Sequence, residues 1–184
     1  VQYGSFLSCS ALTFTGCDIG LVVDGPSEIY AGAMKFINNK SRGLHASELG
    51  AIVTFTEGPT FSGSTTCLEA NRGEVMAWRS SFTSCDTAVV AGQGSVDISY
   101  SILTGTGGTG STAIVAVTGT VFFYGAQLIN WQIGVNCLMG GTVDGYSTAS
   151  VASVTTPLYI STETNRCIRT CGPFGASGAF ACPT

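Results

Sequence analysis

Residues 73–94 read GEVMAWRSSFTSCDTAVVAGQG and make up one complete unit of an internal repeat. The unit begins and ends with a glycine, and its short apolar runs are separated by Ser, Asp and Gly turns. Such a glycine recurs at intervals of 25, 23, 21, 25 and 22 residues, at Gly25, Gly50, Gly73, Gly94, Gly119 and Gly141. A nearly constant period in the range of about 20–50 residues indicates a repeat architecture.

A bulky apolar residue also returns eight to eleven residues after each of these glycines. In a stack of parallel coils, equivalent residues of neighbouring coils lie about 4.8 Å apart, so this position predicts an internal ladder of side chains. The expected members are Phe14, in a shortened first copy, followed by Phe36, Phe61, Phe82, Ile102, Leu128 and Val151.

The repeat predicts an all-β fold. Two or three short strands with turns between them are what one coil of a parallel β-solenoid requires, and the stacked coils bury a continuous core. A leucine-rich repeat protein is not expected, because the leucine and asparagine signature of that repeat is absent. Helical repeats are not expected either, because no stretch shows a sustained 3.6-residue periodicity. We expect the solenoid to span residues 1–165, with the Cys- and Gly-rich residues 166–184 as a C-terminal cap over the open strand edges.

The repeat unit resembles the right-handed parallel β-helix of bacteriophage tail spikes and tail fibres, which pectate lyases and polysaccharide depolymerases share. The resemblance rests on a small-residue strand, a Phe-x-Asn/Cys turn, a short Gly-Leu/Val strand and a closing glycine. Two copies match closely, Phe14-Thr-Gly-Cys17-Asp18 and Phe82-Thr-Ser-Cys85-Asp86. Over roughly residues 10–160 it implies about seven right-handed coils. It further implies a homo-oligomer, commonly a trimer, that attaches to the virion and recognises or cleaves host-surface glycans.

Charge is scarce and unevenly placed. Charged residues make up 10% of the chain, the mean hydropathy is +0.37, the net charge is −4 and the pI is about 4.7. So apolar a composition excludes disorder, and without a basic face we expect no nucleic-acid partner. No Asp, Glu, Lys or Arg occurs between Asp97 and Asp144. We expect part of this stretch to be core and part to face another subunit or partner.

The apolar stretch Ala113–Ile129 is nearly long enough to cross a membrane as a helix. It contains Thr, Gly, Tyr and Gln, is rich in β-branched and aromatic residues, and lacks flanking Lys or Arg. These features depart from the pattern of an anchored span, so we expect no membrane insertion.

Eight cysteines lie at positions 9, 17, 67, 85, 137, 167, 171 and 182. Zinc binding requires close pairs of Cys or His, and the only histidine, His45, is far from Cys167 and Cys171 in the sequence. We therefore expect no metal and no cofactor, and we expect the cysteines before Cys167 to be small buried side chains. In an oxidising environment a disulfide from Cys171, or from Cys167, to Cys182 would close the terminal loop.

The candidates for a catalytic site are one histidine and a pair of carboxylates. His45 has no nucleophile motif around it, so a surface position or an inter-coil hydrogen-bonding role is expected for it. Glu28, Asp97 and Asp144 each lie three residues after a turn glycine, which predicts one shared outward face. Asp97 and Asp144 would be two coils, or roughly 9.6 Å, apart. Glycosidases place two carboxyl groups about 5–9.5 Å apart, so this pair is the candidate for polysaccharide cleavage.

Aromatic side chains recur in successive coils and could serve as platforms for sugar rings. The candidate ligand-binding residues are Trp78, Tyr100, Tyr124, Trp131 and Tyr146. Some of them must lie in the core, because outward aromatics in every coil would make an aggregation surface.

These observations favour a structural protein of the phage virion, a tail spike, tail fibre or head decoration, that attaches to a host-surface glycan or to neighbouring virion proteins. One alternative is a polysaccharide depolymerase, either hydrolase or lyase. A second is a secreted or cell-surface β-helix adhesin, for which disulfides and the Asn39-Lys40-Ser41 glycosylation sequon would be natural.

Overall fold

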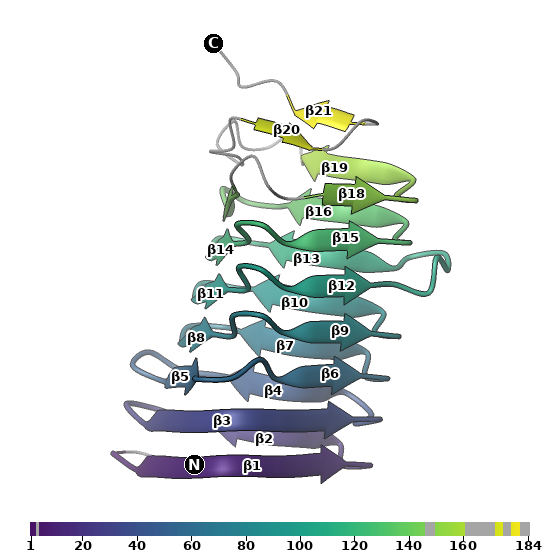
Figure 1. Cartoon of the computed structure of the whole chain (residues 1–184). Helices are drawn as coiled ribbons and strands as arrows, with labels where there is room; N and C mark the ends of the chain where they lie inside the picture. Colours follow the sequence, from purple (N-terminus) through teal and green to yellow (C-terminus); the bar gives the residue numbers. More distant parts are fainter. Residues whose placement is uncertain (3, 146–149, 161–171, 175–177, 181–184) are drawn as a thin grey trace.

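The computed structural model describes residues 1–2, 4–145, 150–160, 172–174 and 178–180. In this part of the chain all regular structure is β, and the strands form a parallel β-solenoid of about six turns with no helix. The predicted fold class is confirmed, with slightly fewer turns than expected. In Figure 1 the front strands run to the right and the rear strands to the left as the chain climbs, so the coil is right-handed. This is the usual hand of parallel β crossovers.

Most coils contribute one strand to each of three columns, and two of these columns share their first strands. β1 (Phe6–Thr15) pairs with β3 (Glu28–Ile37), and β3 pairs with both β5 and β6, so the two columns diverge above it. The first column continues as β5 (Ile52–Phe55), β8 (Glu74–Met76), β11 (Ser95–Asp97), β14 (Thr120–Phe122) and β17 (Thr142–Asp144). The second column continues as β6 (Thr60–Ser62), β9 (Ser81–Thr83), β12 (Ile102–Thr104), β15 (Gln127–Ile129) and β18 (Ser150–Ala152).

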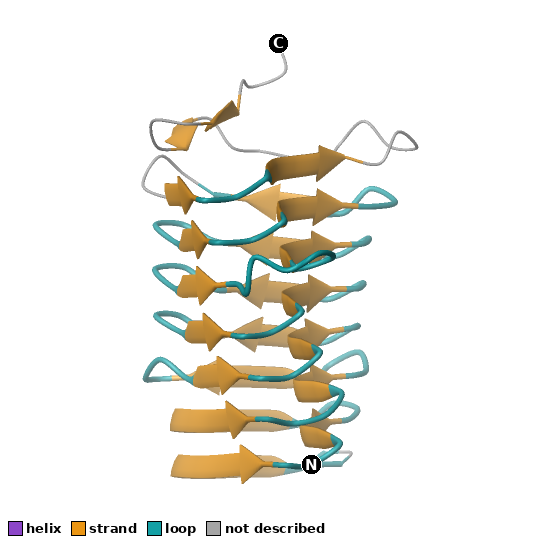
Figure 2. Ribbon diagram, turned by 90° about the vertical axis from the view of Figure 1, so that its right-hand side faces the viewer, coloured by secondary structure: helices purple, strands orange, loops and turns teal. Residues whose placement is uncertain are grey.

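The third column forms the opposite wall of the solenoid (Figure 2). It consists of β2 (Ile19–Val23), β4 (Arg42–Ala46), β7 (Thr66–Ala70), β10 (Thr87–Ala91), β13 (Thr112–Ala116), β16 (Ile133–Cys137) and β19 (Thr156–Ile160). Outside the columns, β20 (Gly172–Phe174) and β21 (Gly178–Phe180) form an antiparallel pair. Most of the residues expected to make the cap, 166–184, lie outside the described residues.

The core consists of ladders of identical or similar side chains, one from each column. In the second column Phe36, Phe61 and Phe82 stack in register, with ring centroids 4.8 Å apart at both steps. The predicted ladder is confirmed except at one position, where Leu103 rather than Ile102 follows Phe82. Ile102 points outward and is 45% exposed. The prediction was one residue out of register, and in a strand such a shift exchanges the two faces.

Gly73, Gly94, Gly119 and Gly141 form one corner of the solenoid, between the third and the first columns. Gly25 and Gly50 do not share their position, which Ser27 and Ala51 occupy in the lower coils, so the predicted repeat is wrong in register for these two glycines. A Cβ atom built on Gly94 would lie 2.2 Å from the carbonyl oxygen of Gly73, and one on Gly119 would lie 2.3 Å from that of Gly94. Such contacts are far inside van der Waals distance, so only glycine lets successive coils approach this closely. The sequence repeat therefore has a steric cause. We call Gly73, Gly94, Gly119 and Gly141 the glycine corner.

Several cysteines that were expected to be unbonded core residues form disulfides. Cys67 of β7 and Cys85, in the turn before β10, form a disulfide across neighbouring coils, and Cys137 is also disulfide-bonded. The prediction that the cysteines before Cys167 are merely small buried side chains is therefore wrong for these three. Cys9 and Cys17 are free, and Cys17 is exposed, so the predicted burial is wrong for Cys17. The disulfide predicted for Cys171 and Cys182 lies outside the described residues.

The apolar stretch 113–129 is folded as strands of the solenoid, from β13 through β14 to β15. Among the described residues, no helix is long and apolar enough to cross a membrane.

Candidate functional site

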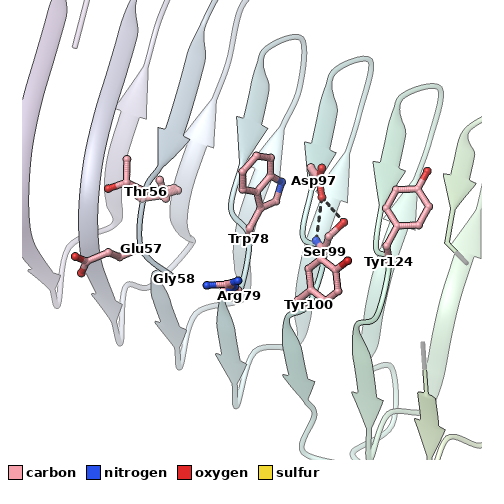
Figure 3. A pocket seen from close by; sticks show the side chains of 10 residues that line it. Thr56, Glu57, Gly58, Trp78, Arg79, Asp97, Ser99, Tyr100 and Tyr124 are labelled. Atoms are coloured by element: carbon pink, nitrogen blue, oxygen red, sulfur yellow. Dashed lines mark hydrogen bonds between the residues drawn. The ribbon is translucent and has the colours of Figure 1, made fainter. Parts of the chain in front are cut away.

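A groove of about 720 Å³ lies on the outside of the corner between the first and second columns (Figure 3). Its aromatic lining comes from Phe55, Trp78, Tyr100 and Tyr124. Its polar lining comes from Thr56, Glu57, Arg79, Asp97 and Ser99, with Gly58 between them. We call the turns 77–79, 98–100 and 123–125, which carry Trp78, Arg79, Ser99, Tyr100 and Tyr124, the aromatic corner.

Backbone hydrogen bonds continue from the strands through the aromatic corner. The amide of Arg79 donates to the Ser99 carbonyl at 3.0 Å, and the amide of Tyr100 donates to the Tyr124 carbonyl at 2.6 Å. The turns therefore stack as the strands do. Trp78, Ser99 and Tyr124 occupy one outward position in successive coils, each two residues after the paired residues Met76, Asp97 and Phe122.

The next position along these turns has a left-handed backbone. The φ angles are 56° at Arg79, 61° at Tyr100 and 63° at Gly125. Glycine adopts this conformation freely, whereas other L-residues lose about 1–2 kcal/mol in it. Two of the three coils nevertheless have a large side chain at this position, and Tyr100 is 66% exposed. The same conformation occurs outside the groove, at Asn38, Ser84, Asn130, Met139 and Ser153, so it is a general feature of the turns of this solenoid and not a mark of the groove alone.

Buried serines hold the corner from the inside. The hydroxyl of Ser80 donates to the carbonyl of Ala77 at 2.6 Å, and the amide of Ser80 donates to the hydroxyl of Ser101 at 2.9 Å. On the outside, the amide and hydroxyl of Ser99 both donate to Oδ1 of Asp97, at 2.9 and 2.6 Å. Oδ2 of Asp97 accepts no hydrogen bond from the described residues. The carboxylate is thus oriented, with one oxygen available to a ligand.

Three of the five predicted aromatic residues come together in this groove: Trp78, Tyr100 and Tyr124. Trp131 does not, because it is 1% exposed and its indole Nε1 donates to the Leu103 carbonyl at 2.9 Å. The ring lies against Gly105, where a Cβ would come within 2.5 Å of it. Trp131 is therefore a core residue, and its proposed role as a sugar platform is wrong. Tyr146 lies outside the described residues.

The predicted catalytic carboxylates, Asp97 and Asp144, do not come together in the groove as the aromatic residues do. Asp97 pairs with Phe122 and Phe122 pairs with Asp144, so the two carboxylates are two coils apart, with an aromatic residue between them. Asp97 lines the groove, whereas Asp144 is not among the described residues that do. Glu28 aligns through Ile52 and Glu74 with Ser95, so the prediction that it shares the position of Asp97 is wrong by two residues.

Six groove residues were not singled out from the sequence: Phe55, Thr56, Glu57, Gly58, Arg79 and Ser99. Arg79 follows Trp78 directly, and Ser99 lies between Asp97 and Tyr100, so an exact alignment of the coils would have found both. Glu57 belongs to a turn that is one residue longer than the turns above it, which obscures that alignment.

His45 lies on the opposite wall, in β4. Its Nδ1 is 3.6 Å from a carboxylate oxygen of Glu69, which also forms an ion pair with Arg42. Burial lowers the pKa of His45 below its usual 6.5 and outweighs the opposing effect of Glu69. The distance of 3.6 Å to Glu69 is longer than a hydrogen bond, and the buried Nδ1 of His45 has no hydrogen-bond partner among the described residues, so the predicted inter-coil hydrogen bond is not formed. Among the described residues, no three His, Cys, Asp or Glu side chains are grouped so as to hold a metal ion.

Comparison with protein families, curated proteins and solved structures finds no match to this chain. The chemistry of the groove is therefore the basis for a functional proposal.

Proposed function

We propose that the protein is an attachment protein that binds a surface glycan in the groove of the aromatic corner. The observation that carries this proposal is the grouping of Trp78, Tyr100 and Tyr124 around the oriented carboxylate of Asp97. Ligand sites combine aromatic walls with a few placed polar groups, and aromatic side chains add contact area with little loss of conformational freedom. Sugars suit such a site, because their rings have apolar C–H faces and hydroxyl edges.

Binding fits this geometry better than cleavage. A glycosidase needs two carboxyl groups on either side of one bond. Asp97 lies in the groove with Oδ1 already bonded to Ser99, and the Phe122 position separates it from Asp144. A polysaccharide depolymerase that uses Asp97 and Asp144 is the second candidate, supported by their matching outward positions. Release of reducing ends that is lost in Asp97→Asn and in Asp144→Asn would favour this enzyme over the binding protein.

The proposed setting is the surface of a phage virion, as a tail spike, tail fibre or head decoration. The Cys67–Cys85 disulfide is compatible with it, since disulfides persist on virion and cell surfaces and in secreted proteins but are rare in the cytosol. A secreted or cell-surface adhesin shares this support. The sequon gives the adhesin none, because Asn39 is fully buried and its amide donates to the Phe14 carbonyl at 3.3 Å.

We propose that copies of the chain assemble through the outer face of the second column, as the trimer of a tail spike would. From β6 to β15 its outward positions are all uncharged: Thr60, Ser62, Ser81, Thr83, Ile102, Thr104, Gln127 and Ile129. The other two faces carry charges, such as Glu74 and Asp97 on the first column and Arg42 and Glu69 on the third. With a net charge of −4, copies repel least through the uncharged face. Sedimentation equilibrium should give a trimer, and a monomer at all concentrations would contradict this assembly.

A glycan array tests the proposed function directly. The wild type should bind members of the array, and Trp78→Ala should lower the affinity about tenfold, or about 1.4 kcal/mol. Trp78 is 48% exposed, so its removal should leave the fold intact. Leu49→Ala is the matched control, because Leu49 is an exposed apolar residue away from the groove. The proposal fails if the wild type binds no glycan, or if Trp78→Ala and Leu49→Ala bind equally well.

A further inference from the structure

Small and large side chains alternate along the floor and walls of the groove. The paired strand residues Thr54, Met76, Asp97 and Phe122 lie one above another in successive coils. Two residues after each of them come, in the same order, Thr56, Trp78, Ser99 and Tyr124. Equivalent positions two coils apart are separated by roughly 9.6 Å. Trp78 and Tyr124 therefore stand on either side of Ser99 and Asp97, with Tyr100 beside Ser99, as Figure 3 shows.

The space between Trp78 and Tyr124 is suited to one flat ring with a polar edge. Its two ends are aromatic, and its floor presents the oriented carboxylate of Asp97. Oδ2 of Asp97 can accept a hydrogen bond from a ring hydroxyl.

A second space lies on the other side of Trp78. Thr56 and Gly58 form its floor, and Glu57 and Arg79 lie at its edge. Gly58 packs so closely that a Cβ there would lie 2.1 Å from the carbonyl oxygen of Arg79, so the floor is kept low. The two spaces lie along the solenoid axis, because they belong to coils two apart in the stack.

The charged side chains of the groove favour uncharged glycans over acidic ones. Two of the three charged groups in the groove, Glu57 and Asp97, are acidic, and the chain carries a net charge of −4. An acidic sugar above Asp97 would place like charges together, which disfavours its binding. Uncharged sugars meet no such repulsion.

We infer that the groove holds a linear, uncharged oligosaccharide of at least three residues, parallel to the solenoid axis. One ring lies between Trp78 and Tyr124, another lies over Thr56, and the residue that joins them crosses Trp78. This inference rests on the proposed glycan-binding function and specifies its ligand.

Calorimetric titration with oligosaccharides of one to six residues tests the inference. The neutral probes are oligomers of glucose, mannose, galactose and N-acetylglucosamine, and the acidic probes are oligomers of galacturonate and mannuronate. For at least one neutral series, affinity should rise at least tenfold between one and three residues and change little beyond four. Acidic oligomers should bind at least tenfold more weakly than neutral oligomers of equal length.

Thr56→Trp separates the two spaces. Thr56 is exposed, and the new indole would fill the second space and leave the first unchanged. The increase in affinity between oligosaccharides of one and three residues should therefore disappear. The affinity for a single sugar should stay within about twofold of the wild type. Thr118→Trp is the matched control. Thr56 and Thr118 both donate from Oγ1 to a carbonyl of the preceding coil, at 3.1 and 2.8 Å, but Thr118 lies at the glycine corner.

The outcomes distinguish the inference from the function on which it rests. Tighter binding of acidic oligomers, equal affinity at all lengths, or no effect of Thr56→Trp would overturn the inference and leave glycan binding in place. No binding of any probe by the folded wild type would overturn both.

Discussion

The glycine corner and the aromatic corner belong to the same coils but obey different constraints. At the glycine corner, Gly73, Gly94 and Gly119 repeat because a Cβ atom would collide with the coil below. At the aromatic corner, Arg79 and Tyr100 adopt positive φ angles although Gly125 shows that glycine also fits this position. The glycine corner repeats its smallest residue because of the coil below, whereas the aromatic corner presents large side chains to the groove. A positive φ does not distinguish the two corners, because Met139 at the glycine corner has a φ of 47° and is 64% exposed. The difference separates the residues that build the solenoid from those that we assign to binding.

Removal of the Cys67–Cys85 disulfide tests this separation with the largest expected effect. The bond joins residues 18 apart in sequence, and the loss of a loop constraint of this size costs about 3 kcal/mol of unfolding free energy. Urea denaturation of the Cys67→Ala/Cys85→Ala double variant should show this loss. Glycan affinity of the folded protein should not change, since neither cysteine lines the groove. Equal losses of stability and affinity would contradict the separation.

Gly94→Ala tests the glycine corner. The added methyl group would lie 2.2 Å from the Gly73 carbonyl oxygen, and such overpacking typically costs about 1–3 kcal/mol. The urea midpoint should fall accordingly, while Ser95→Ala, next to it on the outer face, should change the stability by less than about 0.5 kcal/mol. A Gly94→Ala variant as stable as the wild type would remove the steric explanation of the repeat.

Tyr100→Gly should have opposite effects on stability and binding. Release of the left-handed strain should stabilise the fold by up to about 1 kcal/mol, and loss of the ring should weaken glycan binding. Ser84→Gly is the control, because Ser84 has a φ of 55° in the turn between β9 and β10, away from the groove. It should change stability without changing affinity. If Tyr100→Gly binds as tightly as the wild type, the strained tyrosine has no role in the groove.

The smallest expected effect is a pH dependence on the wall opposite the groove. Burial lowers the pKa of His45 below 6.5, while Glu69 and Asp24 oppose the shift and Arg42 adds to it. The unfolded chain therefore binds the proton more readily than the folded chain, so stability should fall as the pH decreases through 6.5. Thermal unfolding between pH 7.5 and 5.5 should show a smaller decrease for His45→Gln than for the wild type. Identical pH profiles would mean that His45 does not couple to folding.

The sequence predicted the features that repeat in every coil and missed those that depend on exact register. The glycine spacing and the apolar ladder were visible because stacking favours similar residue types at equivalent positions of neighbouring coils. Ile102 was misplaced because Ile102 and Leu103 are both apolar and the inward or outward direction changes with every residue, so only the spacing of nine residues from Gly94, the same as from Gly73 to Phe82, identifies Leu103 as the inward one. Trp131 was misplaced because its burial depends on close packing against Gly105 of the preceding coil, which the sequence alone does not reveal. The Cys67–Cys85 disulfide was missed because connectivity cannot be deduced from cysteine spacing alone.

The groove was predicted in part for the same reason. Trp78, Tyr100 and Tyr124 were visible as recurrent aromatics, but their grouping with Arg79 and Ser99 follows from inter-coil hydrogen bonds that a single sequence does not reveal. Local turn geometry, such as the positive φ at Tyr100, also depends on the stacked coils on both sides.

A crystal structure of the protein with the neutral oligosaccharide that it binds most tightly is the most direct test of the central claim. We predict a sugar ring between Trp78 and Tyr124, with a hydroxyl donating to Oδ2 of Asp97 and the chain running along the solenoid axis. A sugar bound at any other face, with the aromatic corner empty, would contradict the account.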